Sequence, residues 1–98
     1  HLGLCPDGHT ASLFPRSPSL QERDRLVVAT GDDAHPHPRI TLTYPAIEQA
    51  SLVVFTVAGA EKRDALAGVL AGDLWLPATR VRAERVVWLA DAAALGEA

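Results

Sequence analysis

The run Leu52-Val53-Val54-Phe55-Thr56-Val57 is the most apolar stretch of the sequence, and it constrains the fold more than any other stretch. Its β-branched and aromatic residues favour a β-strand. It lacks the regular alternation of a strand that keeps one face in water. Near-continuous apolar strands occur where a parallel sheet is covered on both faces. We therefore expect residues 52–57 to form a central, buried strand.

Strand-like and helix-like segments alternate along the rest of the chain. Further strands are expected at residues 26–30, 39–43 and 86–90. Short helices are expected after Tyr44-Pro45, over about 60–70, and after Asp91, which is a suitable N-cap. This order predicts an α/β fold, as part of a doubly wound, mainly parallel sheet with flanking helices, either Rossmann-like or flavodoxin-like. The chain opens in strand-like Leu2-Gly3-Leu4 and contains no Met, so we expect it to be incomplete at its N-terminus.

Charge and composition narrow the classes of partner. The net charge of −3 and the pI of about 5.7 argue against nucleic acid. No apolar run approaches the roughly 18 residues of a membrane span, so no membrane partner is expected. The single cysteine, Cys5, cannot form an intrachain disulfide, which suits a cytoplasmic protein. The sequence predicts no particular oligomeric state.

Asp7 and His9 form the strongest candidate site, in the stretch from Cys5 to Pro15. They follow a strand-like segment and flank Gly8 in a turn, and open α/β sheets bind ligands at the carboxyl ends of their strands. Thr10 is a suitable helix N-cap for the apolar residues after it. From spacing alone, an ordinary strand–turn–helix joint with Asp7 and His9 in solvent is an equally good interpretation.

The side chains of Arg39 and Lys62 are candidates for binding an anion. Arg39, Thr41 and Thr43 would share one face of an alternating strand, although a solvated strand face explains the alternation better. Lys62, the only lysine, follows Gly59-Ala60 at a helix start, where free N–H groups favour an anion. On chemistry alone, a surface lysine with an i,i+4 contact is the favoured alternative.

His35 and His37 suggest a metal site by their spacing alone. No third ligand stands near them in the sequence, whereas zinc normally takes three or four protein ligands. We therefore interpret both as loop histidines in solvent and expect no metal.

Several stretches together resemble the 6-phosphogluconolactonases. Residues 2–15 are similar to the signature G-x-G-P-D-G-H-T-A-S-L-F-P, and residues 38–47 are similar to P-R-I-T-L-T-x-P-x-I/L. Gly59-Ala60-Glu61-Lys62 matches a G-x-x-K turn, and residues 76–78 and 87–94 resemble the closing segment. The resemblance covers essentially the whole chain but only about the C-terminal half of a family member. It implies that residues 1–98 are the C-terminal portion of a single lactonase-like domain.

The resemblance implies hydrolysis of 6-phospho-D-glucono-1,5-lactone to 6-phosphogluconate in the oxidative pentose phosphate pathway, with no cofactor. A lactone is an activated ester, so a water and a base poised near neutral pH suffice. By resemblance His9 is that base, and Asp7 orients its ring or holds the substrate. Gly8 would let the backbone approach the substrate. Arg39 and Lys62 would bind the 6-phosphate.

Two positions distinguish this chain. Cys5 stands where the family usually has Gly, and its Cβ would collide with a backbone that needs a positive φ or a close approach of the ligand. Phe14 stands where the related glucosamine-6-phosphate deaminases, with D-G-H-I-A-F-N-E-P, have a glutamate that takes part in opening the sugar ring. Phe14 therefore favours the lactonase over a deaminase or isomerase.

Two further alternatives are a non-catalytic sugar-phosphate-binding paralogue and a structural portion of a fusion enzyme. In the family, the N-terminal half supplies a Gly/Ser-rich phosphate-binding loop. We therefore expect the 98 residues alone to have little or no lactonase activity.

Overall fold

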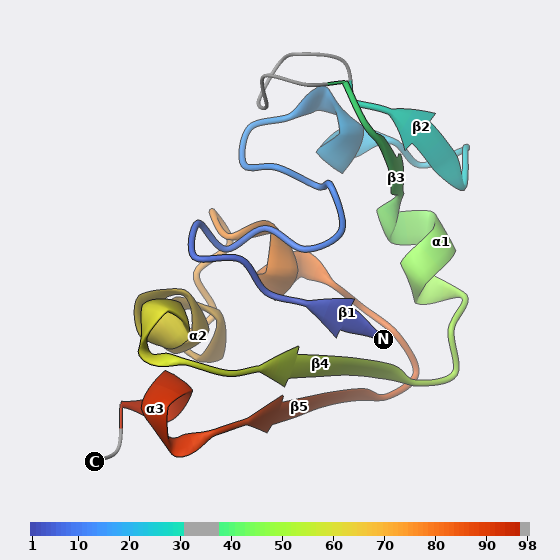
Figure 1. Ribbon diagram of the computed structural model, residues 1–98. Coiled ribbons are helices and arrows are strands. Elements are labelled where there is room, and N and C mark those ends of the chain that lie inside the picture. The colour runs from blue at the N-terminus through green and yellow to red at the C-terminus, as the bar shows by residue number, and fades with distance from the viewer. Residues whose placement is uncertain (31–37, 97–98) are drawn as a thin grey trace.

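The computed structural model describes residues 1–30 and 38–96, so His35 and His37 lie outside the described residues. Strands β1 (Leu2–Gly3), β4 (Val53–Val57) and β5 (Val86–Ala90) form a parallel sheet in the order β1-β4-β5. Strand β4 lies in the middle, as the apolar run predicts (Figure 1). The predicted α/β fold with a parallel sheet and flanking helices is confirmed.

Short helices and 3-10 turns lie between the strands and after the last one. They are α1 (Tyr44–Glu48), α2 (Arg63–Leu70) and α3 (Ala92–Leu95), together with the 3-10 turns η1 (Pro18–Gln21), η2 (Ala60–Lys62) and η3 (Pro77–Arg80). Strands β4 and β5 point toward the end of the sheet at which α2 and α3 lie (Figure 1). The predicted helix starts at Tyr44-Pro45 and after Asp91 are confirmed, because Thr43 and Asp91 cap those helices through their side chains.

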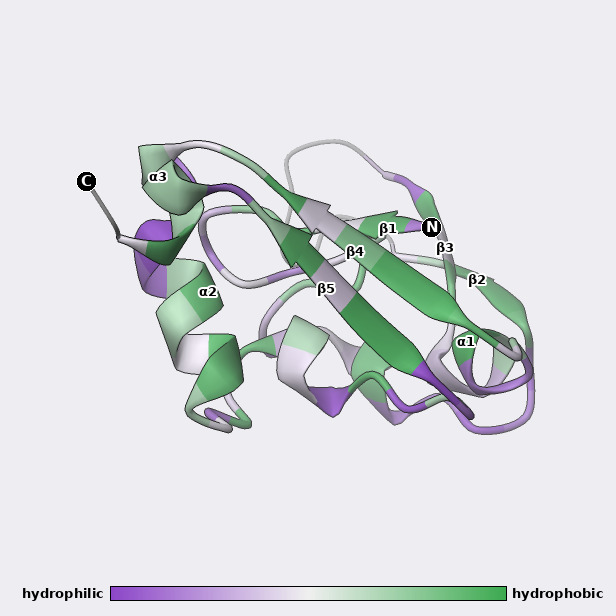
Figure 2. Cartoon of the chain, turned by 90° about the horizontal axis from the view of Figure 1, so that it is seen from below, coloured by the Kyte–Doolittle hydropathy of each residue, from purple (hydrophilic) through white to green (hydrophobic). Residues whose placement is uncertain are grey.

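One face of β4 forms the centre of the core. Val53, Phe55 and Val57 are buried there, and the Phe55 ring stacks on Trp88 of β5 with centroids 3.9 Å apart. Figure 2 shows the two strands side by side and hydrophobic over most of their length. On the opposite face Val54 is half-buried and Thr56 is exposed. The expected burial of both faces therefore holds for one face within the described part of the chain.

Strands β2 (Val27–Ala29) and β3 (Ile40–Leu42) form a separate antiparallel hairpin. The expected solvated polar face of β3 is wrong, because Thr41 is buried whereas Ile40 is 75% exposed. Thr41 Oγ1 accepts the Ser12 N–H at 3.0 Å and donates to the Leu42 carbonyl at 2.8 Å. A threonine whose hydroxyl is hydrogen-bonded can point inward at little cost.

None of the helices among residues 1–30 and 38–96 has the length and apolar character needed to cross a bilayer.

Candidate active site

The loop after β1 is closed by short-range hydrogen bonds. The Cys5 N–H donates to the His9 carbonyl at 3.0 Å, and the Gly8 N–H donates to the Cys5 carbonyl at 2.8 Å. Gly8 has a φ of +87°, which a glycine adopts without strain. This turn brings Asp7 and His9 to the same side of the loop.

Asp7 and His9 form a direct pair. Asp7 Oδ1 lies 2.5 Å from His9 Nδ1 and also accepts the His9 backbone N–H at 3.1 Å. An ionised carboxylate can only accept hydrogen bonds, so it selects the imidazole form with its proton on Nδ1. That tautomer leaves the Nε2 lone pair free to take a proton. The His9 side chain is 16% exposed and that of Asp7 is 53% exposed, so a joint with both side chains in solvent does not describe His9.

Phe14 packs against the ring of His9. The rings of His9 and Phe14 have centroids 4.5 Å apart and are tilted by 54°. Phe14 is 4% exposed. The aromatic ring thus limits the orientations of the imidazole that the Asp7 carboxylate already restricts.

Thr10 does not begin a helix, so this prediction is wrong. Its Oγ1 donates to the Gly3 carbonyl at 2.7 Å, and residues 10–13 form a turn closed by a Leu13 N–H to Thr10 carbonyl bond of 3.0 Å. Thr10 instead links the loop that carries Asp7 and His9, hereafter the site loop (residues 4–13), to β1 through a hydrogen bond.

Arg39 and His9 line one cavity of about 260 Å³. Its remaining lining residues are Cys5, Ala11, Ser12 and Phe14. Arg39 immediately precedes β3, and Thr41 of that strand accepts the Ser12 N–H. The inward-facing threonine thereby fixes the strand that carries Arg39 beside the loop that carries His9.

Lys62 is tied to the base of the same loop. Its Nζ donates to the carbonyl of Leu4, the residue directly after β1 and at the start of the loop. This partner is 58 positions away in the sequence, so the i,i+4 surface contact is not what the structure shows. Lys62 is half-buried and does not line the cavity shared by His9 and Arg39.

Gly8 faces the protein interior. Its carbonyl accepts the Ala78 N–H at 3.0 Å, and a Cβ built on it would lie 2.6 Å from Leu76 Cδ2. The sequence analysis missed this contact between η3 and the site loop. The apolar residues Leu74, Trp75 and Leu76 before Pro77 indicate packing against the core, but not against this loop. Binding of substrate by Gly8 stays a prediction.

Cys5 fits its position without strain. Among the described residues, the non-glycine positions with positive φ are Ala11 and Arg16, so the clash expected from a positive φ does not arise at Cys5. A clash with a closely approaching ligand stays a prediction. Its free thiol is half-buried and contributes to the lining of the cavity.

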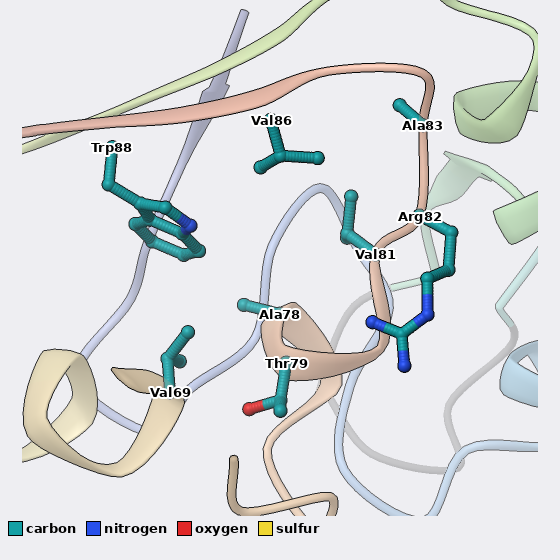
Figure 3. Close-up of a pocket in the computed structure, with 8 residues that line it drawn as sticks. All are labelled: Val69, Ala78, Thr79, Val81, Arg82, Ala83, Val86 and Trp88. Carbon is teal, nitrogen blue, oxygen red and sulfur yellow. The ribbon is translucent and has the colours of Figure 1, made fainter. Parts of the chain in front are cut away.

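A second cavity, of about 250 Å³, lies between α2, η3 and β5 (Figure 3). Trp88 and Val86 point from β5 toward Val69 and Ala78, and the buried Thr79 Oγ1 has no hydrogen-bond partner. This cavity contains none of the predicted site residues. Across the described ranges, no group of three or more His, Cys, Asp or Glu side chains could hold a metal ion.

Known proteins resemble this chain in sequence and in structure. The family model of glucosamine-6-phosphate isomerases/6-phosphogluconolactonase matches residues 1–88. The 6-phosphogluconolactonase of Nostoc sp. is 50% identical over 98% of this chain and 41% of its own length. The human 6-phosphogluconolactonase is 41% identical over 95% of this chain and 38% of its own length.

Solved structures agree with these sequence matches. The 6-phosphogluconolactonase from Thermotoga maritima has a TM-score of 0.77 and 38% identity, over 91% of this chain and 40% of that one. A monomeric glucosamine-6-phosphate deaminase has a TM-score of 0.70 at 20% identity, which shows a shared fold alone. The chain spans about 40% of the length of the curated relatives it matches. It belongs to the glucosamine-6-phosphate isomerase/6-phosphogluconolactonase family.

Proposed function

We propose that the protein hydrolyses 6-phospho-D-glucono-1,5-lactone to 6-phosphogluconate in the oxidative pentose phosphate pathway. The observation that carries this proposal is the Asp7–His9 pair, whose imidazole shares a cavity with the Arg39 guanidinium. Relatives that are 41% and 50% identical bear the name 6-phosphogluconolactonase. We also propose that residues 1–98 form the C-terminal portion of a single domain of this kind.

In the proposed mechanism His9 acts as a general base. Its Nε2 takes a proton from a water as the water oxygen bonds to the lactone carbonyl carbon. The tetrahedral intermediate then collapses, the bond from that carbon to the ring oxygen breaks, and the imidazolium returns the proton to the ring oxygen. Asp7 holds the ring in the required tautomer and stabilises the imidazolium. A nearby backbone N–H would stabilise the oxyanion.

The 6-phosphate is proposed to bind Arg39 and Lys62. Arg39 lines the cavity with His9, and a guanidinium binds phosphate through paired hydrogen bonds. Lys62 donates one hydrogen bond to Leu4, and an ammonium has two further donors for a ligand. This pair of cations would place the lactone ring relative to His9.

The deaminase alternative lacks support at Phe14. A buried aromatic ring lies against His9 where a ring-opening glutamate would be needed. We also propose a cytoplasmic protein that acts on a small molecule, without a membrane partner. Its single cysteine cannot form an intrachain disulfide, and its net charge of −3 argues against nucleic acid.

The test is a coupled assay of lactone hydrolysis on the protein in its natural length. We expect His9→Ala to lower kcat by about 10²- to 10⁴-fold, the usual contribution of a general base. Binding of 6-phosphogluconate, measured by calorimetry, should stay within about twofold, because the cations that hold the phosphate are unchanged. Retained turnover in His9→Ala, or ammonia release from glucosamine 6-phosphate by the natural protein, would contradict the proposal.

A further inference from the structure

Asp91 joins two elements through one carboxylate. It follows β5 directly, and its Oδ1 accepts the Ala94 N–H at 2.8 Å as the N-cap of α3. The same carboxylate accepts the Gly59 N–H, with Oδ1 and Oδ2 both 3.2 Å from the nitrogen. Gly59 lies 32 positions earlier in the chain, so this second contact is not part of helix capping.

Gly59 begins the turn that carries Lys62. Its φ of +99° and ψ of 149° belong to a region that is essentially open only to glycine. The Gly59 carbonyl accepts the Lys62 N–H at 3.1 Å, which closes the turn η2. A carboxylate on the Gly59 N–H therefore fixes the peptide from which the Lys62 side chain is positioned.

The far end of the Lys62 side chain is held as well. Its Nζ donates to the Leu4 carbonyl at the base of the loop that carries Asp7 and His9. The lysine is thus anchored at its backbone by Asp91 through Gly59, and at its ammonium by the Leu4 carbonyl. A lysine side chain has four flexible carbons, so both anchors are needed to keep the ammonium in one place.

We propose that Asp91 is a positioning residue for Lys62, and that it acts on the binding of the substrate phosphate. This inference rests on the proposed role of Lys62 as a phosphate ligand. Asp91 touches neither the cavity nor the loop that carries His9. Its loss should therefore weaken the binding of phosphorylated substrate and leave the chemistry at His9 nearly unchanged.

Asp91→Ser is the informative variant, in the protein at its natural length. Serine is a good N-cap, so α3 stays capped. Its hydroxyl oxygen lies one bond closer to the backbone than the carboxylate oxygens and carries no charge, so it can cap α3 but does not reach the Gly59 N–H, which loses its charged partner. We expect KM for the phosphorylated lactone to rise about tenfold, as for the loss of one charge-assisted hydrogen bond, with kcat within about twofold.

A structural role alone would not produce the further pattern that we expect. KM for glucono-1,5-lactone without the phosphate should not change, because no group is present for Lys62 to bind. Lys62→Ala should raise KM by at least as much as Asp91→Ser. The double variant should match Lys62→Ala alone, since two residues that act as one unit are not additive.

Asp73→Ser is the matched control. Asp73 Oδ1 accepts the Trp75 N–H at 3.0 Å in a turn after α2, with no connection to Lys62. It should leave KM unchanged. Should Asp91→Ser fold poorly in thermal unfolding, Asp91→Asn serves instead, because it keeps the cap and removes one acceptor oxygen and the charge.

The outcomes separate the two proposals. An unchanged KM in Lys62→Ala overturns the phosphate role of Lys62 and the positioning role with it. A raised KM in Lys62→Ala with an unchanged KM in Asp91→Ser overturns the positioning role alone. Effects that multiply in the double variant show that Asp91 acts by another route and also overturn it.

Discussion

Gly8 links the site loop to the rest of the core. Its φ is +87°, its carbonyl accepts the Ala78 N–H, and a side chain at this position would meet Leu76. The glycine is thus required by backbone conformation and by packing at once. This explains why Asp7 and His9 flank a residue with no side chain.

Gly8→Ala should separate these two requirements when compared with Gly72→Ala. Gly72 has a similar φ of +81°, but a Cβ there would meet no atom within 4 Å. We expect Gly72→Ala to cost about 1–2 kcal/mol from the backbone alone. Gly8→Ala should cost about 1–3 kcal/mol more, because Leu76 must move. Urea unfolding of both variants measures this, and equal costs would contradict the packing argument.

Tyr44 should make the free energy of unfolding depend on pH. Burial raises its pKa to about 12, and its hydroxyl donates to the Pro77 carbonyl at 2.6 Å. As pH rises, the tyrosine of the unfolded chain ionises first, near pH 10. The contribution of Tyr44 to the free energy of unfolding should therefore be fully present below pH 10. It should fall by about 2 kcal/mol between pH 10 and 12.

The measurement is urea unfolding at pH 8, 10, 11 and 12 for the natural protein and for Tyr44→Phe. The variant should be less stable at pH 8 by about 1 kcal/mol, for the lost hydrogen bond. Its stability should decline less than that of the natural protein above pH 10. Parallel curves for the two proteins would show that Tyr44 does not carry this dependence.

At the scale of elements, β3 controls the position of Arg39. Thr41 of this strand accepts the Ser12 N–H, and Ser12 lines the cavity together with Arg39. The strand and the site loop are therefore held together by a side-chain acceptor on a backbone donor.

Thr41→Val keeps the shape of the side chain but removes this acceptor. We expect it to cost about 1–3 kcal/mol, because the Ser12 N–H loses its partner. KM for the phosphorylated lactone should rise, since Arg39 is less well fixed. Thr41→Ser retains the hydroxyl and should show the smaller change in KM. Steady-state kinetics of the two variants decide, and a normal KM in Thr41→Val would contradict the argument.

The elements that sequence predicted correctly are those with local causes. The β-branched run of β4, the proline of α1 and the Asp91 cap act within a few residues. Thr10 and Thr41 were predicted wrongly, because their partners are the Gly3 carbonyl and the Ser12 N–H, which only the tertiary fold brings near.

The features of the candidate site also fall into those that the local sequence predicts and those that depend on distant residues. Asp7 and His9 are only two residues apart, so the motif suggested the pair, although spacing alone left two side chains in solvent an equally good interpretation. The approach of Arg39 to His9 was expected from family resemblance and not from local pattern. The packing of Leu76 on Gly8 could be predicted only as burial of an apolar residue, because its partner lies far away in the sequence.

At the scale of the whole molecule, the hairpin exposes an apolar surface. Val27 and Leu42 are paired across β2 and β3, and they are 51% and 46% exposed, beside Ile40 at 75%. Contiguous apolar surface of this kind is normally covered by protein. The relatives that match this chain are more than twice its length.

The isolated 98 residues should therefore behave differently from the protein in its natural length. We expect them to bind a hydrophobic dye and to self-associate, and Ile40→Lys should reduce both effects. Lactone hydrolysis by the isolated chain should stay at the background rate. Light scattering, dye fluorescence and the coupled assay measure these properties. Turnover near that of a natural-length homologue would contradict the expectation.

The hydrogen bonds of the site loop also have a consequence for the order of folding. Those from Cys5 to His9, from Gly8 to Cys5 and between Asp7 and His9 span at most four positions, whereas Lys62 reaches Leu4 across 58. Contacts of short sequence separation close with less loss of chain entropy. We therefore expect Asp7 and His9 to come together before the parallel sheet has assembled. Partial unfolding of the sheet should release Lys62 from Leu4 and weaken the proposed binding of phosphate, while the Asp7–His9 pair persists.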